Sequence, residues 1–343
     1  MTTTAIRIAV IGGGAWGTGL AIVLGRKGTR EFCHEVRLWA NEPEVCESIS
    51  KNRINESFLP GFVLPESIVA TNDLNAALDG AEMIVSVMPS QHCRALFERM
   101  APALSPETVF VSCTKGLEEK TLLRMTEVIC DVLRSRKFTA RVAALSGPSF
   151  AKEVARGDPT AVTVASADAE VTRTVQRAFN DSRFRVYTND DVIGVELGGA
   201  LKNIIAIAAG VCDGLGLGHN SVAALITRGL AEVARLVVAC GGRLDTMAGL
   251  AGLGDLVLTC TGDLSRNRSV GVELGKGRKL SDIIAGMHGA VAEGVFTTKT
   301  ALALARQKNV EMPITEQMFA ILENGKSPQR AIDDLMTRAA RSE

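Results

Sequence analysis

The pattern of hydrophobic and polar residues divides the chain into two parts. Up to about residue 190, short runs of β-branched and other apolar residues alternate with segments in which apolar residues recur at helical spacing. Continuous apolar runs of this length are typical of strands covered on both faces, as in a parallel sheet. The alternation predicts a doubly wound α/β domain over residues 1–190. The expected strands are RIAVIG (7–12), EVRLWA (35–40), EMIVSVMP (82–89), TVFVSC (108–113), RVAALSG (141–147), TAVTVAS (160–166) and FRVYTND (184–190).

Beyond residue 190 the β-rich runs stop and the pattern becomes helical. Long segments rich in Ala, Leu and Gly have apolar residues three or four positions apart, as in Ala223, Ile226, Leu230, Val233 and Val237. This spacing predicts an all-helical domain over residues 191–343. The boundary depends on the change of periodicity alone, because no Pro-rich or Gly/Ser-rich linker separates the two halves.

Composition restricts the classes of partner. The 343 residues include 38 basic and 38 acidic side chains, so bulk charge attracts neither nucleic acid nor an anionic membrane. No apolar run reaches the roughly 18 residues of a membrane helix, and the N-terminal stretch lacks the features of a secretory signal. We therefore expect a cytoplasmic protein. The eight cysteines are dispersed without a CxxC pair, which favours reduced, buried thiols and no metal site.

A glycine-rich turn in IAVIGGGAWGTGLAIVLG (8–25) lies between a strand-like and a helix-like run. Gly12 permits a tight turn, Gly14 lets a pyrophosphate approach the backbone, and Gly17 lets the helix pack closely on the sheet. The helix N-terminus adds free N–H groups and a partial positive charge. This context predicts dinucleotide binding, and a purely structural glycine turn is the alternative.

The end of the second strand bears on the choice of cofactor. NAD-binding domains often have an acidic residue there, and NADP-binding domains often have Arg. This chain has Ala40-Asn41-Glu42, with no acid at the strand tip and no basic residue immediately after it. Because the Glu42 carboxylate can reach the ribose, the sequence favours NAD and leaves NADP open.

Lys202 is the first candidate for proton transfer. GVELGGALKNIIAIAAG (194–210) contains only two charged residues, Glu196 and Lys202. On a helix, mostly small residues lie beside Lys202 and leave room for a ligand. Partial burial would lower the pKa of a lysine from about 10.4 toward 7–8, a useful range for a general base. The alternative is a lysine whose amine reaches solvent from an apolar helix.

Two further candidates directly follow expected strands. Lys115 lies in SCTKGLE (112–118), and Gly147-Pro148-Ser149 lies in LSGPSFAKEV (145–154). In an open parallel sheet, ligands bind at the carboxyl ends of strands, so Lys115 is placed to meet a phosphate or a polarised oxygen. The turn at Gly147 offers N–H groups and the Ser149 hydroxyl. An ordinary exposed loop is the alternative at both places.

The segment 249–271 contains Asp255 in a glycine-rich apolar context and then Ser265-Arg266-Asn267-Arg268. Ser265 is suited to cap a helix N-terminus, and the planar fork of Arg266 is suited to phosphate. Together they can form an anion site at a helix start. A solvated basic turn is the alternative.

Taken in order, these segments resemble the NAD(P)-dependent glycerol-3-phosphate dehydrogenases of the bacterial cytoplasmic type. The resemblance extends over nearly the whole chain, to about residue 325. The blocks that match are GGGAWGTGLA (12–21), FLPG (58–61), MPSQ (88–91), TKGLE (114–118), LSGPSFAKEV (145–154), ELGGALKN (196–203), LGLGHNSVAALITRGLAE (215–232), GLAGLGDL (249–256), SRNR (265–268) and VAEGV (291–295).

The resemblance implies a Rossmann-like domain that binds NAD or NADP, and a helical domain that binds a small phosphorylated substrate. It implies reversible reduction of dihydroxyacetone phosphate to sn-glycerol 3-phosphate, a supply of this product for phospholipid synthesis, and a homodimer. Lys202 matches the family's proton donor or acceptor, and we expect Lys115 and Asp255 to be catalytic too. The expected substrate contacts are Lys115, Gly147, Ser149, Lys202, Asp255, Ser265, Arg266 and Asn267. The expected cofactor contacts, besides the loop glycines, are Ala15, Trp16, Asn41, Lys115, Ala151, Arg266, Val291 and Glu293.

The sequence departs from the family pattern at a few positions. Asn41 replaces the basic residue common in members that use NADP, which leaves the cofactor preference open. His219 and Ser221 replace an acid and a Thr in the LGLG block, and we expect this change to affect packing or an interface.

Two other functions compete with this interpretation. One is a 3-hydroxyacid or ketopantoate-type reductase, which also joins a Rossmann domain to a helical domain. The SRN and GPSFA blocks disfavour it because they suit a phosphorylated substrate. The other is a nicotinamide-binding redox sensor without turnover, which would have no need for Lys115, Lys202, Asp255 and Arg266 together.

Overall fold

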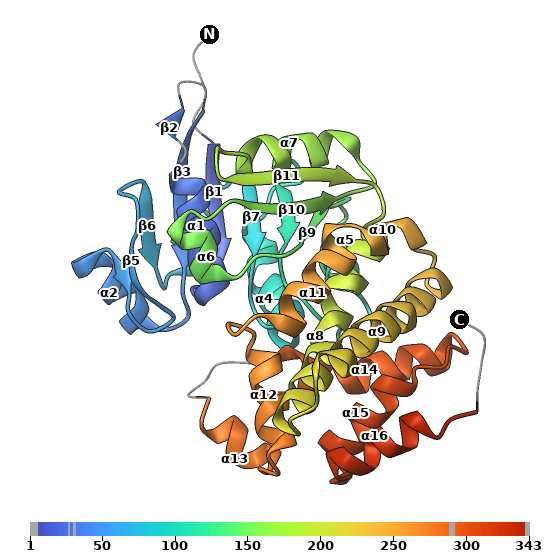
Figure 1. Cartoon of the computed structure of the whole chain (residues 1–343). Coiled ribbons are helices and arrows are strands. Elements are labelled where there is room, and N and C mark those ends of the chain that lie inside the picture. Colours follow the sequence, from blue (N-terminus) through green and yellow to red (C-terminus); the bar gives the residue numbers. More distant parts are fainter. Residues whose placement is uncertain (1–5, 27, 30–31, 288–291, 340–343) are drawn as a thin grey trace. The chain divides into compact units, whose positions relative to one another are not determined.

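The computed structural model describes residues 6–26, 28–29, 32–287 and 292–339, which divide into two compact units (Figure 1). The first unit is Met1–Thr114 with Leu123–Val192, and the second is Lys115–Leu122 with Ile193–Glu343. The passage at Val192 lies next to the boundary predicted at residue 190. The short segment Lys115–Leu122 differs from the prediction, which assigned it to the N-terminal domain. It groups with the helical unit because Leu117 is buried in the core of that unit.

The first unit is built on a mostly parallel sheet. Among the described residues this sheet has nine strands in the order β11-β10-β9-β8-β7-β1-β3-β2, and β6 also pairs with β3. All seven expected strands are present, and β2 and β6 are additional. The strands are β1 (Ile6–Ile11), β2 (Gly28–Thr29), β3 (Phe32–Trp39), β6 (Ile68–Thr71), β7 (Met83–Ser86), β8 (Val109–Ser112), β9 (Arg141–Ser146), β10 (Thr160–Ala165) and β11 (Phe184–Asn189).

One strand direction departs from the parallel sheet that the sequence predicts. β10 runs antiparallel to β9, with Thr163 opposite Ser146. After β9 the chain turns at Gly147. Its φ of +146° is a backbone conformation that residues other than glycine rarely adopt. A Cβ on Gly147 would lie 2.9 Å from the Cα of Val162 in β10, so the turn packs directly against the returning strand. The β2–β3 pair is also antiparallel.

Helices cover both faces of the sheet, as expected for a doubly wound α/β fold. Ile8 and Val10 of β1 pack on one face, and their neighbours Ala9 and Ile11 pack on the other. The first face is covered by α1 (Ala15–Gly25), α2 (Pro43–Asn52), α6 (Ala151–Arg156) and α7 (Ala169–Phe179). The second face is covered by α3 (Leu74–Leu78), α4 (Cys93–Met100) and α5 (Met125–Arg134). A small separate hairpin, β4 (Ile54–Asn55) and β5 (Leu59–Val63), follows α2.

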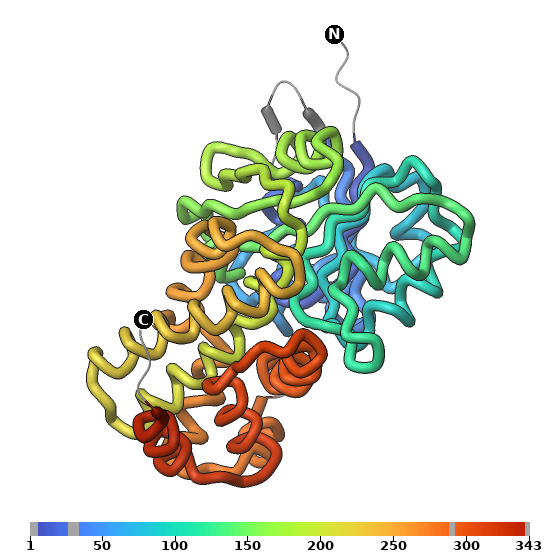
Figure 2. The backbone as a smooth tube through the Cα atoms, turned by 90° about the vertical axis from the view of Figure 1, so that its right-hand side faces the viewer, coloured from blue at the N-terminus to red at the C-terminus, as the bar shows by residue number. Residues whose placement is uncertain are grey.

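From residue 193 on, the regular elements of the second unit are helices throughout its described residues, as Figure 2 shows for the yellow to red part of the chain, whereas the segment Lys115–Leu122 forms no helix. α8 is long and apolar enough to cross a membrane by length and composition alone. However, 83% of its most apolar window is buried against the rest of the structure, which accounts for its composition. The helices are α8 (Val192–Gly214), α9 (His219–Ala239), α10 (Leu244–Ala248), α11 (Asp255–Thr261), α12 (Arg266–Gly275), α13 (Leu280–Ala285), α14 (Glu293–Gln307), α15 (Pro313–Asn324) and α16 (Pro328–Met336).

Paired glycines bring α8 and α12 into close contact. Gly210 and Gly214 of α8 face Gly271 and Gly275 of α12, each pair four residues apart. A Cβ on Gly271 would lie 1.9 Å from the Ile207 carbonyl oxygen, and a Cβ on Gly210 would lie 2.0 Å from the Arg268 carbonyl oxygen. The two backbones therefore touch directly, which fixes α12 against the C-terminal part of α8.

We expect Gly271→Ala to lower the free energy of unfolding by about 1–3 kcal/mol, because the new methyl group meets backbone that has no room to move. Gly286→Ala is the matched control, since its Cβ would lie at an ordinary 3.5 Å from the Ile283 carbonyl oxygen. Urea denaturation of both variants measures the difference. Equal stability of the two variants would contradict the proposed contact between α8 and α12.

Candidate active site

The centre of the site in the second unit is the carboxylate of Asp255, which is 1% exposed. Asp255 begins α11 directly after a π-helical turn, Leu250–Gly254, a feature frequent at functional sites. Its Oδ2 accepts a hydrogen bond of 2.7 Å from Lys115 Nζ, and its Oδ1 accepts one from Lys202 Nζ. One buried carboxylate therefore joins two lysines that lie far apart in the sequence.

Small residues on α8 make this contact possible. Lys202 lies in the middle of α8, and Gly198 lies one turn before it. A Cβ on Gly198 would lie 2.8 Å from the Ala251 carbonyl oxygen and 3.0 Å from Met247 Cε. From the sequence, the space beside Lys202 is expected to hold a ligand. At Gly198 this space is instead filled by the π-helical turn, which brings Asp255 within reach of the lysine.

Thr259 completes the surroundings of the Lys202 amine and is not among the residues predicted from the sequence. Lys202 Nζ donates to Thr259 Oγ1 at 2.6 Å, and Thr259 Oγ1 donates to the Asp255 carbonyl oxygen at 2.6 Å. The hydroxyl proton is thus committed to the helix, so Thr259 can only accept from the lysine. An ammonium group has three donors, and two of them are used here. The spacing of four residues from Asp255, which puts Thr259 on the same helix face, was the signal available in the sequence.

Burial and charge act in opposite directions on the pKa values of the three groups. Burial lowers the pKa of Lys202, and the nearby Lys115 ammonium lowers it further, so that it falls to about 8 despite the Asp255 carboxylate. Burial also disfavours the charge on Lys115, but Asp255 outweighs it and raises the pKa of Lys115. Burial alone would raise the pKa of Asp255, but the two lysines hold it below its usual value. Of these three groups, Lys202 is therefore the one able to exchange a proton near neutral pH.

Glu293, at the start of α14, is a second carboxylate of the site. Burial raises its pKa to about 7, against the opposing charges of Arg266, Lys115 and Lys202. These charge interactions bring together four residues that the sequence predicts for the site.

The start of α12 carries the other predicted residues of this unit. Ser265 is the N-cap that the sequence predicts, with its Oγ accepting from the Arg268 N–H at 3.2 Å. Asn267 is buried, and its Oδ1 accepts a hydrogen bond of 2.9 Å from the Gly294 N–H at the start of α14. The exposed Arg266 is the first residue of α12, between these two anchored side chains. Val291 lies outside the described residues.

The glycine loop of the first unit has the geometry that the sequence predicts. Gly12 has φ +130°, and a Cβ on it would lie 2.6 Å from the Val87 carbonyl oxygen. A Cβ on Gly17 would lie 1.9 Å from the Gly12 carbonyl oxygen, so only glycine lets α1 start this close to the strand. Around Gly14, by contrast, no described atom beyond those of its immediate neighbours in the chain lies within 4 Å of a Cβ position. The backbone is thus open where a pyrophosphate would approach, and the residues present fit a dinucleotide.

The remaining predicted residues of the first unit surround this loop or the end of β9. Ala15 and Trp16 form the first turn of α1, and Ala151 begins α6, which packs on α1 beside Gly19. Asn41 follows β3 and is exposed. Ser149 donates a hydrogen bond of 2.8 Å to the Gly147 carbonyl oxygen in the turn after β9.

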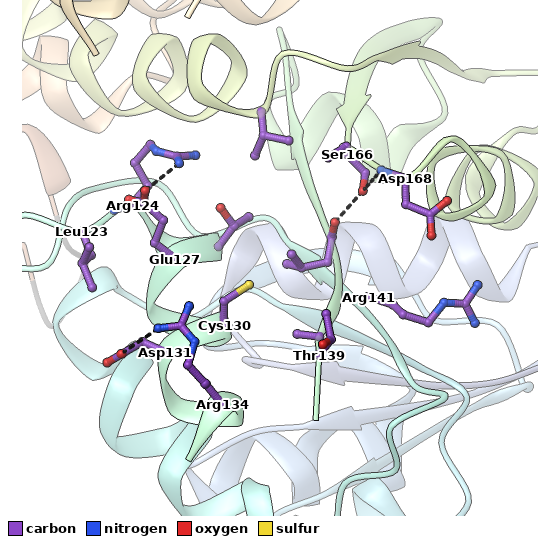
Figure 3. A pocket seen from close by; sticks show the side chains of 15 residues that line it. Leu123, Arg124, Glu127, Cys130, Asp131, Arg134, Thr139, Arg141, Ser166 and Asp168 are labelled. Atoms are coloured by element: carbon purple, nitrogen blue, oxygen red, sulfur yellow. Dashed lines mark hydrogen bonds and ion pairs between the residues drawn. The ribbon is translucent and has the colours of Figure 1, made fainter. Parts of the chain in front are cut away.

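A pocket of about 560 Å³ elsewhere in the first unit contains none of the predicted residues (Figure 3). It is lined by α5, the start of β9 and the segment after β10. Its three arginines are balanced by three carboxylates, and two of these carboxylates are already paired: Arg124 with Glu127 at 2.8 Å, and Asp131 with Arg94 at 2.7 Å. This balance gives the pocket no preference for a phosphorylated ligand.

The fold and the two sets of residues define a class of protein: an oxidoreductase with a dinucleotide-binding α/β unit and a helical unit carrying a lysine–carboxylate site. Comparison with known families gives the particular one. Residues 7–172 match the NAD-dependent glycerol-3-phosphate dehydrogenase N-terminus, and residues 191–333 match the C-terminus of the same family. The chain belongs to the NAD-dependent glycerol-3-phosphate dehydrogenase family, as its sequence blocks predict.

Individual relatives agree along the whole chain. It is 66% identical over 337 residues to a glycerol-3-phosphate dehydrogenase (NAD(P)+) of Koribacter versatilis, covering 98% of both chains. It is 57% identical over 340 residues to that of Acidobacterium capsulatum, covering 98% and 99%. The crystal structure of glycerol-3-phosphate dehydrogenase from Coxiella burnetii matches with a TM-score of 0.90 at 42% identity, covering 97% and 99%.

The reductase alternative shares the fold only. A ketopantoate reductase from Ralstonia eutropha matches with a TM-score of 0.57 at 18% identity. Because the two families share the Rossmann-plus-helical architecture, the fold alone does not separate them. The ordered sequence blocks do.

We expect Asp255→Asn to destabilise the protein by about 3–5 kcal/mol at neutral pH, because the amide keeps the shape but leaves buried ammonium groups uncompensated. The loss should shrink as the pH rises, since unpaired buried lysines have lowered pKa values and release their protons on folding.

Asp263→Asn is the control, because Asp263 pairs with Arg268 at 3.0 Å but its side chain is 94% exposed. Chemical denaturation at several pH values compares the two variants. If both variants lose a similar free energy of unfolding that does not change with pH, the charges around Asp255 do not form a buried cluster.

Proposed function

We propose that this chain interconverts dihydroxyacetone phosphate and sn-glycerol 3-phosphate by hydride transfer with NAD(P)H, and supplies glycerol 3-phosphate for phospholipid synthesis. The observation that supports it most directly is the Lys202 amine, buried and held by Asp255 and Thr259 with one donor position left over. A ketone oxygen that becomes a hydroxyl needs one such proton donor.

In the proposed mechanism, Lys202 donates a proton to the C2 oxygen of dihydroxyacetone phosphate as C2 accepts a hydride. NAD(P)H supplies this hydride when bound. In the reverse direction the neutral Lys202 amine takes the proton from the C2 hydroxyl. Lys115 keeps its positive charge and polarises the same oxygen, while Asp255 holds both amines in place.

For the substrate phosphate we propose the start of α12, with Ser265, Arg266 and Asn267 as contacts. A helix N-terminus favours an anion, and an Arg fork binds phosphate through two parallel bonds. Because Asn267 Oδ1 already accepts from Gly294 N–H, the amide is oriented with its NH₂ group available to donate. Gly147 and Ser149 are the further proposed contacts.

For the cofactor we propose the glycine loop with Ala15, Trp16, Asn41 and Ala151 from the first unit, and Lys115, Arg266, Val291 and Glu293 from the second. The preference proposed is NAD. The segment after β3 has Asn41 and then Glu42 and Glu44, whose carboxylates repel the extra phosphate of NADP.

A cytoplasmic homodimer is also proposed. Its support is the family resemblance together with large apolar side chains exposed on the helical unit, such as Leu244 at 65% and Phe296 at 52%.

The first test follows NADH and NADPH oxidation on addition of dihydroxyacetone phosphate. We expect turnover with both, faster with NADH, and a loss of at least about a hundredfold in kcat for Lys202→Ala, as for a missing general acid. Lys299→Ala is the matched control, because this exposed lysine of the same unit pairs with Glu119. Near-normal kcat in a folded Lys202→Ala variant, or no turnover by the unaltered chain, would overturn the proposal.

The pH dependence tests the role of Lys202 separately. Its pKa of about 8 predicts that glycerol 3-phosphate oxidation rises with pH through this value, because the base must be neutral. Reduction should fall above the same pH, because the acid must be protonated.

Replacing Lys115 by Gln removes the neighbouring charge that lowers the pKa of Lys202. The rise in oxidation and the fall in reduction should therefore both move to higher pH. The profiles of kcat/KM in the two directions give the answer. If the pH values at which kcat/KM rises and falls are unchanged in Lys115→Gln, Lys202 is not the titrating group.

A further inference from the structure

Asn55, in the short hairpin of β4 and β5, is in contact with the glycine loop. Its side chain is completely buried, at 0% exposed. Asn55 Nδ2 donates to the Gly13 carbonyl oxygen at 2.8 Å and to Thr18 Oγ1 at 2.8 Å, and Asn55 Oδ1 accepts from the Phe58 N–H at 3.1 Å. Thr18 Oγ1 also donates to the Gly13 carbonyl oxygen, at 3.3 Å. Neither Asn55 nor Thr18 was among the predicted site residues.

The two ends of the Asn55 amide hold different parts of the unit. Its oxygen fixes the turn of its own hairpin, where FLPG (58–61) begins at Phe58. Its NH₂ group fixes the loop, because both of its protons go to Gly13 and to the first helical turn after it. The hairpin is anchored in turn by Leu59, which is fully buried in the same core as α1.

Holding the Gly13 carbonyl decides where the next N–H points. The peptide bond is planar and trans, so the Gly13 C=O and the Gly14 N–H point in opposite directions. With the carbonyl drawn inward by Asn55 and Thr18, the Gly14 N–H is turned away from them. Gly14 N–H makes no hydrogen bond within the described part of the chain, and the space around Gly14 is open. On its other side, Gly13 is packed against Ala40 so closely that a Cβ would lie 2.4 Å from the Ala40 Cβ.

We propose that Asn55 is a positioning residue for the dinucleotide: it presets the Gly13–Gly14 peptide so that the Gly14 N–H faces the pyrophosphate. This inference rests on the proposed function. It assigns to the FLPG hairpin the task of supporting the phosphate-binding loop. The peptide is already oriented in the folded chain. Cofactor binding therefore loses no free energy to orienting it.

Asn55→Asp separates the two ends of the amide. One carboxylate oxygen keeps the acceptor for Phe58 N–H, while the other replaces the NH₂ donor and repels the Gly13 carbonyl oxygen. We expect the dissociation constants of NADH and of ADP-ribose to rise by the same factor, at least about tenfold, equivalent to one lost hydrogen bond. The KM of dihydroxyacetone phosphate at saturating NADH should stay unchanged.

Acidic pH should restore affinity in Asn55→Asp. A protonated carboxyl regains a donor toward Gly13, and burial raises its pKa above the usual value of about 3.9. Fluorescence titration with NADH, and competition by ADP-ribose, measure the affinity from neutral pH downward. The matched control is Asn180→Asp, because Asn180 also accepts a backbone bond through Oδ1, from Val186 N–H at 2.6 Å, in the same unit. The control should bind both nucleotides as the unaltered chain does at every pH.

The outcomes separate this inference from the proposed function. If the unaltered chain binds neither NADH nor NADPH, the proposed function is overturned and this inference with it. If the unaltered chain binds and Asn55→Asp binds equally well, only the positioning role is overturned. A loss of thermal stability in Asn55→Asp without any change in nucleotide affinity also overturns the positioning role alone. If Asn55→Asp does not fold, Asn55→Ser, which keeps a small donor, takes its place, and unchanged NADH and ADP-ribose affinities in it would overturn the positioning role.

Discussion

The chemistry of the helical unit depends on one buried negative charge between two positive ones. Asp255 accepts a hydrogen bond from Lys115 and another from Lys202 in surroundings where an isolated charge is costly. One carboxylate cannot compensate two ammonium groups fully, so the more deeply buried lysine gives way and its pKa falls to about 8. The arrangement therefore holds the cluster together and at the same time prepares one member of it for proton exchange.

Both the lysine–carboxylate site and the glycine loop depend on the close approach of two backbone segments. In the helical unit, Gly198 lets the π-helical turn reach α8, and Gly271 lets α12 reach it from another direction. In the α/β unit, Gly12 and Gly17 bring α1 against the strand end. At each of these positions a side chain would displace main chain, so the glycines determine where the charged and N–H groups lie.

Several features were accessible to sequence reasoning because they are local. The seven expected strands and the helical half follow from periodicity, and Ser265 as N-cap follows from its residue type and place. The antiparallel β10 and the β4–β5 hairpin were not predicted. Strand direction leaves no trace in a run such as TAVTVAS, and a two-residue strand is too short to show alternation. The grouping of Lys115–Leu122 with the helical unit leaves no local signal, because Leu117 belongs to a core made mostly of helices that begin at residue 192 and beyond.

The sequence by itself determined the architecture, the glycine loop and the family, because periodic patterns and ordered blocks are properties of neighbouring residues. Only the tertiary structure decided which charges meet. The pairings of Asp255 with Lys115 and Lys202, and of Asn55 with Gly13, join residues 140, 53 and 42 positions apart. Such pairings depend on how helices and strands pack, and the cost of leaving buried polar groups unpaired selects the few that are satisfied.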